Sequence, residues 1–158
     1  MRSSYFSNFP IIKEILQTYM GLNEDSCNIN DLSNEDWRTL ITNLFYYVIG
    51  TSTPAISAGI CSLKYMHDIS PHRFDKSIVS IILEANNINL NDSWDYNNLY
   101  MMMQVCNCST INDFLCIGVN SSDVDVSESA KGYLIENQKD SIWYEYYLNE
   151  YKKRISNM

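Results

Sequence analysis

The chain has 158 residues, of which 46% are hydrophobic and 13% aromatic, as is typical of one globular domain, here residues 1–158. Its formal net charge of −8 argues against nucleic acid as a partner, because nucleic-acid-binding proteins need a basic surface. The five cysteines are an odd number and several lie in apolar runs, so we expect reduced thiols and a cytoplasmic protein.

The first predicted element is an amphipathic helix from Pro10 to Gly21. Proline suits the first turn of a helix, Ile and Leu recur at helical spacing, and glycine is a typical stop. Lys13 and Glu14 interrupt the apolar residues. We therefore expect neither a signal peptide nor a membrane-spanning segment, and no membrane partner.

A second helix is predicted to begin after Ser33. Ser33 followed by Asp36 resembles a capping box, and it opens an apolar run of helical period that ends at Gly50. We expect Trp37 and Leu44 of this run to lie in the core.

Two helices that each open with a proline follow, and the second ends near Ala85. Thr53-Pro54 and Ser70-Pro71 each pair a capping residue with a proline at the first helical position. The short connection predicts that these helices lie antiparallel. The first is rich in small residues, which let neighbouring helices approach closely, so we place it at the centre of the protein.

The second half of the chain contains further helical patterns. A helix is predicted at residues 94–106, a short one at 111–118, and a last one from about Asp140 to the basic residues 152–154. Basic side chains suit the C-terminus of a helix, because they interact favourably with its dipole.

The stretch 120–134 allows three interpretations: a strand, a calcium-binding loop, or the start of a helix. The alternation of valines is too short for a strand, and Glu128 occupies the position where a calcium loop requires glycine. Ser122 is therefore predicted to cap a helix whose first turn contains Asp123 and Asp125, where the helix dipole favours anions.

Together these signals predict an all-α protein of about eight helices arranged in antiparallel hairpins. Helices joined by short turns in this way resemble a stack of the HEAT type. A compact helical bundle is the alternative.

The sequence contains no nucleophile elbow, phosphate-binding glycine loop or zinc-protease motif, so we expect no enzyme and no cofactor. Cys106, Cys108 and Cys116 match no standard zinc spacing, and buried thiols rather than a metal site are predicted. A catalytic or metal site would require one of these thiols to meet His67 or His72 in space, which spacing does not test.

Charge asymmetry is the feature most informative for function. Between Ser77 and Ala130 there are seven acids and no Lys or Arg, and several of the acids lie at helix starts that stacked hairpins would bring to a common edge. Such a surface serves solubility alone or binds a basic partner. Tyr and Trp residues near the C-terminus are of the kind found at contact hot spots. The predicted partner-binding residues are Asp92, Asp95, Asp113, Asp123, Asp125, Glu128, Trp143 and Tyr147.

With this charge and helical pattern, the chain resembles immunity proteins of bacterial polymorphic toxins, such as those of contact-dependent growth inhibition systems. The resemblance implies a cytoplasmic protein, monomeric on its own, that binds its cognate toxin domain 1:1 and blocks it. Such toxins are often basic nucleases. The alternative is a viral modulator of host signalling that resembles the poxviral Bcl-2-like proteins and would bind an apolar helix in a groove.

Overall fold

The computed structural model describes residues 9–23 and 28–137 together with 145, 146, 149, 152, 153, 156 and 157. These residues contain seven α-helices and no strand, so the predicted all-α class is confirmed. The helices are α2 (Pro10–Glu14), α3 (Asn34–Val48), α4 (Thr53–Ile69), α5 (Pro71–Glu84), α6 (Ser93–Val105), α7 (Ile111–Val119) and α8 (Val124–Asn137), with a π-helical turn η1 (Ile15–Tyr19) and a 3-10 turn η3 (Ile29–Asp31). Most of the predicted last helix lies outside the described residues.

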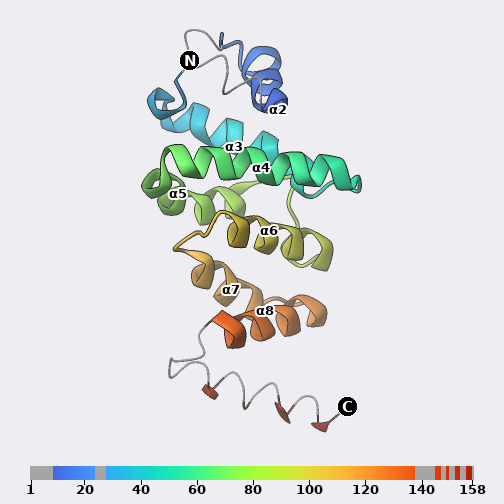
Figure 1. Cartoon of the computed structure of the whole chain (residues 1–158). Coiled ribbons are helices and arrows are strands. Elements are labelled where there is room, and N and C mark those ends of the chain that lie inside the picture. The colour runs from blue at the N-terminus through green and yellow to red at the C-terminus, as the bar shows by residue number, and fades with distance from the viewer. Residues whose placement is uncertain are drawn as a thin grey trace.

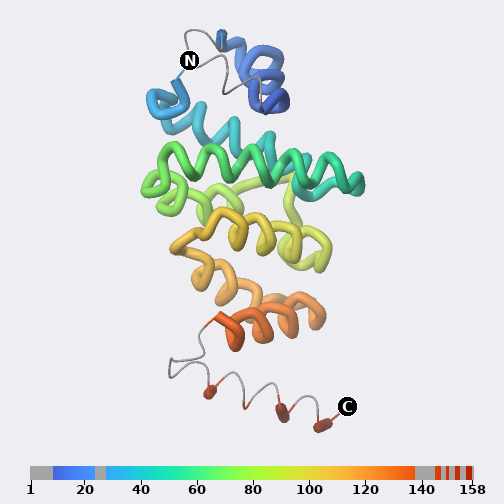
Figure 2. The backbone as a smooth tube through the Cα atoms, in the orientation of Figure 1, coloured from blue at the N-terminus to red at the C-terminus, as the bar shows by residue number. Residues whose placement is uncertain are grey.

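The helices are piled along one axis, from α2 at one end to α8 towards the other (Figures 1 and 2). α3 and α4 form one antiparallel hairpin, and α7 and α8 form another (Figure 1). This arrangement is the predicted stack of hairpins rather than the compact bundle. In such a stack alternate helices run in the same direction, so their N-termini come to the same edge.

α4 lies at the centre of the stack, as its small residues predict, and it packs against α2, α3, α5 and α6. At Gly59, α4 lies tightly against α3. A Cβ atom at this position would lie 2.9 Å from Cβ of Tyr47 and 3.0 Å from a methyl group of Val48. Because real Cβ atoms do not approach so closely, glycine allows the two helices their spacing.

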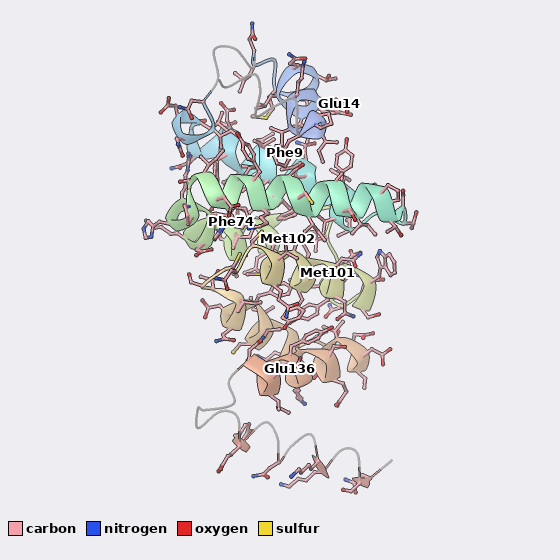
Figure 3. The ribbon with its side chains drawn as sticks, viewed as in Figure 1. Phe9, Glu14, Phe74, Met101, Met102 and Glu136 are labelled. Carbon is pink, nitrogen blue, oxygen red and sulfur yellow. The ribbon has the colours of Figure 1, made fainter. Side chains whose placement is uncertain are left out.

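One hydrophobic core extends through the stack from Ile12 to Leu134. Trp37 and Leu44 are buried within it, as predicted. Two consecutive methionines of α6, both labelled in Figure 3, differ in burial because neighbouring residues of a helix face different directions. Met102 is fully buried, whereas Met101 is 48% exposed. No helix among the described residues is long and apolar enough to cross a membrane.

The helix starts confirm some predicted caps and correct others. Ser33 caps α3, since its Oγ accepts a hydrogen bond from the N–H of Asp36 at 3.0 Å. Neither Ser52 nor Ser70, the residues that precede α4 and α5, forms a side-chain cap with a described residue. α4 already begins at Thr53, which was the predicted cap.

The cap predicted at Ser122 is wrong. Asp123 caps α8, because its Oδ1 accepts a hydrogen bond from the N–H of Val126 at 3.0 Å. α8 begins at Val124, and a cap must stand directly before the first helical residue for its side chain to reach the N–H groups of the first turn. Ser121 instead accepts from the N–H of Asp123 at 3.1 Å, which holds the capping residue in place.

Candidate functional site

α6 and α8 begin at the same edge of the stack and are joined there. Asp92 caps α6 by accepting hydrogen bonds from the N–H groups of Trp94 and Asp95 at 2.9 and 3.2 Å. The hydroxyl of Ser121, just before α8, donates to Oδ1 of Asn91, just before α6, at 2.7 Å. This bond holds the two helix starts together and with them four carboxylates. We call Asp92, Asp95, Asp123 and Asp125 the acidic edge.

The carboxylates of the acidic edge differ in their exposure. Asp92 and Asp125 are exposed, whereas Asp95 and Asp123 are partly buried. Burial raises the pKa of Asp95, and the neighbouring charge of Asp92 adds to this, while a hydrogen bond from the N–H of Asn89 at 3.0 Å works in the opposite direction. The carboxylates of Asp92 and Asp95 therefore repel each other.

Two further predicted residues lie elsewhere. Asp113 is in the first turn of α7, which runs opposite to α6 and α8, so Asp113 lies at the opposite edge. There Thr110, just before α7, donates from its hydroxyl to the carbonyl oxygen of Asp75 at 3.2 Å. The expectation of one common edge is therefore wrong for Asp113. Glu128 is on the second turn of α8 and partly buried.

Two predicted residues, Trp143 and Tyr147, lie outside the described residues. The seventh acid between Ser77 and Ala130, Glu84, forms an ion pair with Arg38 on α3. Its charge is thereby compensated, and it does not contribute to a uniformly acidic surface.

The structure also brings together three side chains that sequence spacing did not connect. His67 on the last turn of α4, Asp75 on the second turn of α5 and Cys108 in the turn between α6 and α7 converge on one point, with one ligand atom of each within 4.8 Å of the others. Nε2 of His67 lies 3.2 Å from Oδ1 of Asp75. The side chains of His67 and Asp75 are 12% and 17% exposed, and Cys108 is 4% exposed.

Local structure explains why Cys108 turns inward. α6 ends in a Schellman motif, in which the N–H of Cys108 donates to the carbonyl of Met103 at 3.0 Å and the N–H of Asn107 to that of Gln104 at 3.1 Å. Asn107 has a φ of 55°, the left-handed conformation that this motif requires and that Asn tolerates better than most residues. The Asn next to Cys108 was the one local signal of this turn in the sequence.

The same turn is attached to α5 through Asp75. Oδ2 of Asp75 accepts hydrogen bonds from the backbone N–H of Ser109 at 3.3 Å and from its hydroxyl at 3.0 Å. Oδ1 of Asp75 and both ring nitrogens of His67 are buried and have no hydrogen-bond partner among the described residues. One oxygen of the carboxylate is thus fully used, and the other faces the imidazole.

The electrostatics of Cys108 do not favour a nucleophile. A hydrogen bond with Cys106 raises the pKa of the Cys108 thiol, and burial and the charges of Cys106 and Asp75 raise it further. A nucleophilic cysteine requires the opposite shift, because the thiolate is the reactive form.

A third surface lies between η1 and α3, near the other end of the stack. The large side chains of Tyr19 and Tyr46 are 67% and 59% exposed there. They border a shallow hollow that is also lined by Ile15, Asn43 and Tyr47. Under the alternative interpretation, this hollow is a candidate for the groove in which an apolar helix would lie.

Comparison of the chain with protein-family models, with curated proteins and with solved structures finds no match. The candidate sites therefore rest on the geometry of the chain itself.

Proposed function

We propose that the chain is a binding protein that neutralises a basic protein domain, in the way that an immunity protein neutralises its cognate toxin. The observation that carries the proposal is the hydrogen bond between Ser121 and Asn91, which joins two helix starts and their four carboxylates into one acidic edge. The sequence between Ser77 and Ala130 offers no Lys or Arg to offset them.

The helix dipoles reduce this negative charge but do not cancel it. A helix N-terminus carries roughly half a positive charge, so the two N-termini offset roughly one of the four negative charges. An edge with a net charge of roughly −3 remains. Complementary charge of this kind speeds the encounter with a basic partner and makes the association rate sensitive to salt.

The proposed mode of action is steric. A basic nuclease binds its substrate through cationic side chains that contact phosphates. Carboxylates on two joined helix starts would compete for the same cations. Once bound, the stack covers the surface that the substrate needs, and no chemical step is required of the immunity protein.

Co-expression tests this function most directly. The full chain is produced together with the C-terminal domain of the protein encoded immediately upstream, and growth of the host is measured. The two purified chains are then titrated at low and high salt. We expect rescue of growth and a 1:1 complex whose affinity falls steeply as salt rises, because exposed charges are screened.

Two results would count against the proposal. Absence of both rescue and complex would contradict the toxin-neutralising function. A tight complex whose affinity does not change with salt would instead favour the apolar surface around Tyr19 and Tyr46, since a groove that holds an apolar helix depends little on ionic strength.

A further inference from the structure

We propose that His67, Asp75 and Cys108 form a binding site for a divalent transition-metal ion of the zinc class. This site is separate from the acidic edge. It lies at the opposite edge of the stack, where α4, α5 and the turn between α6 and α7 meet. The proposal does not depend on the toxin-neutralising function.

The first argument is the unusual approach of His67 and Asp75. Nε2 of the imidazole and Oδ1 of the carboxylate are 3.2 Å apart, yet neither has a hydrogen-bond partner among the described residues. Buried polar atoms are nearly always hydrogen-bonded, and each exception requires an explanation. Two such atoms that face a common point can both be satisfied by a cation bound there.

The second argument is the spacing of the ligand atoms. Tetrahedral zinc binds nitrogen and oxygen at about 2.0 to 2.2 Å and sulfur at about 2.3 Å, so its ligand atoms lie roughly 3.3 to 3.8 Å apart. The distance of 3.2 Å from Nε2 to Oδ1 is already close to the lower end of this range. Sγ of Cys108 lies within 4.8 Å of a ring nitrogen of His67 and of a carboxylate oxygen of Asp75, so the ligand atoms need to draw together by roughly 1 Å to reach the spacing of a zinc site.

The third argument is the chemistry of the donor set. One imidazole nitrogen, one carboxylate oxygen and one sulfur favour zinc and similar ions over calcium and magnesium, which require oxygen ligands. Three protein ligands leave one position of a tetrahedral zinc ion for water.

The fourth argument is that the surrounding residues already orient two of the ligands. Ser109 holds the second carboxylate oxygen of Asp75. The ring of Phe74, which is labelled in Figure 3, meets the ring of His67 edge-on at a centroid distance of 5.3 Å. Nδ1 of His67 lies 3.6 Å from Oδ1 of Asp68. This is too long for a hydrogen bond, but a small movement would let the imidazole donate to this carboxylate, as histidines that bind metals commonly do.

Binding of the metal ion would require the buried thiol of Cys108 to ionise. Cys108 must lose its proton to bind the ion, and the proton passes to the solvent, so the affinity should rise with pH. The charge of the metal ion would stabilise the thiolate that the protein alone disfavours.

The test uses the full chain with Cys27→Ser, Cys61→Ser and Cys116→Ser. Cys61 and Cys116 are the exposed thiols of the described residues, and Cys27 lies outside them. The protein is stripped with a chelator, and Zn²⁺ is titrated in competition with a chromophoric chelator. Co²⁺ is added to a second sample, because a Co²⁺–thiolate bond gives a charge-transfer absorption band. We expect one equivalent of Zn²⁺ per chain and a thiolate band with Co²⁺.

The ligands are assigned by single substitutions in this background. We expect His67→Gln, Asp75→Asn and Cys108→Ser each to lower the affinity for Zn²⁺ by about 100-fold or more, since even outer-shell residues are worth 10- to 100-fold. The matched control is His72→Gln, the other histidine, which lies exposed on α5 and should leave the affinity unchanged. Cys106→Ser replaces a thiol that is hydrogen-bonded to that of Cys108, so it should lower the affinity as an outer-shell residue does, by less than Cys108→Ser.

Three results would overturn the site. The first is the absence of stoichiometric Zn²⁺ binding or of a thiolate band in the background chain, which needs no ligand variant to be folded. The second is retention of full affinity in any of the three ligand variants, with circular dichroism used to compare their folding. The third is an equal loss in Cys106→Ser and Cys108→Ser, which would exclude the proposed set of three ligands.

Discussion

The phenol group of Tyr96 on α6 lies directly against Gly118 on α7, where it occupies the space that a Cβ atom would need. Tyr96 is fully buried. Its ring stacks on that of Phe114 at a centroid distance of 4.6 Å, and its hydroxyl donates to the carbonyl oxygen of Phe114 at 3.2 Å. The glycine therefore sets how closely α6 and α7 pack.

The substitution Gly118→Ala should destabilise the fold. The added methyl group would collide with the ring of Tyr96, and overpacking of this kind costs about 1 to 3 kcal/mol. The control is Gly132→Ala in α8, where, apart from the neighbouring residues and backbone of α8 itself, no heavy atom of the described residues lies within 4 Å of the new Cβ. There alanine should stabilise by about 0.5 to 1 kcal/mol, because glycine is a poor helix former. Urea unfolding measures both, and equal stability of the two variants would contradict the packing.

Tyr96 should also contribute to alkaline unfolding. Burial raises the pKa of Tyr96 above the ordinary value, and nearby tyrosines and Cys116 raise it further. Because the folded pKa is the higher one, the stabilising effect is complete below the unfolded pKa of about 10 and is lost as the pH rises above it. One such group lowers the free energy of unfolding by about 1.4 kcal/mol per pH unit in this range. Tyr96→Phe should show a shallower decline above about pH 10, and a parallel decline would argue against burial of the phenol.

Core substitutions in α3 should be costly. Trp37 and Leu44 are at most 1% exposed, and the indole N–H of Trp37 donates to Oγ of Ser77 at 2.9 Å. Trp37→Ala and Leu44→Ala should each lower the free energy of unfolding by about 3 to 5 kcal/mol. Leu83→Ala on α5, where the side chain is 56% exposed, is the control and should change stability by less than about 0.5 kcal/mol. Chemical denaturation distinguishes these outcomes.

The acidic edge can be neutralised without loss of its caps. Asn caps helices about as well as Asp, so Asp92→Asn, Asp123→Asn and Asp125→Asn together remove three charges but keep the capping oxygens. We expect stability within about 1 kcal/mol of the original chain and weaker binding of the toxin domain at low salt.

Asp113→Asn removes one charge at the opposite edge and is the control for position. It should leave binding unchanged. If the triple variant bound as tightly as the original chain, or if Asp113→Asn weakened binding as much, the acidic edge would not be the binding surface.

The left-handed backbone conformation of Asn107 at the end of α6 can also be tested by substitution. Asn107→Ala should destabilise by about 1 to 2 kcal/mol, because a Cβ atom is disfavoured at positive φ without a compensating polar group. Asn107→Gly should be tolerated, since glycine is the usual residue at this position of a Schellman motif. Thermal unfolding of the two variants should therefore differ by several degrees in favour of glycine, and the reverse order would contradict the conformation of Asn107.

Much of the fold could be read from local patterns. Apolar residues at helical spacing correctly predicted seven helices and the burial of Trp37 and Leu44. The small residues of α4 correctly predicted its central place. These features depend on neighbours three or four positions apart in the chain, which the helical repeat brings to one face. The cap of α8 was wrong by one residue, because Ser122 and Asp123 are both good capping residues and the pattern alone does not choose between them.

The candidate sites depended on the tertiary structure. Asp92 and Asp123 share an edge because alternate helices run in the same direction, whereas Asp113 lies at the other edge because α7 runs back between them. His67, Asp75 and Cys108 come from three elements and meet only when the turn after α6 docks on α5. The sequence by itself determined which residues each helix buries, since that is a matter of local periodicity. Which helix ends meet depends on the direction and packing of whole helices, and only the tertiary structure decided it.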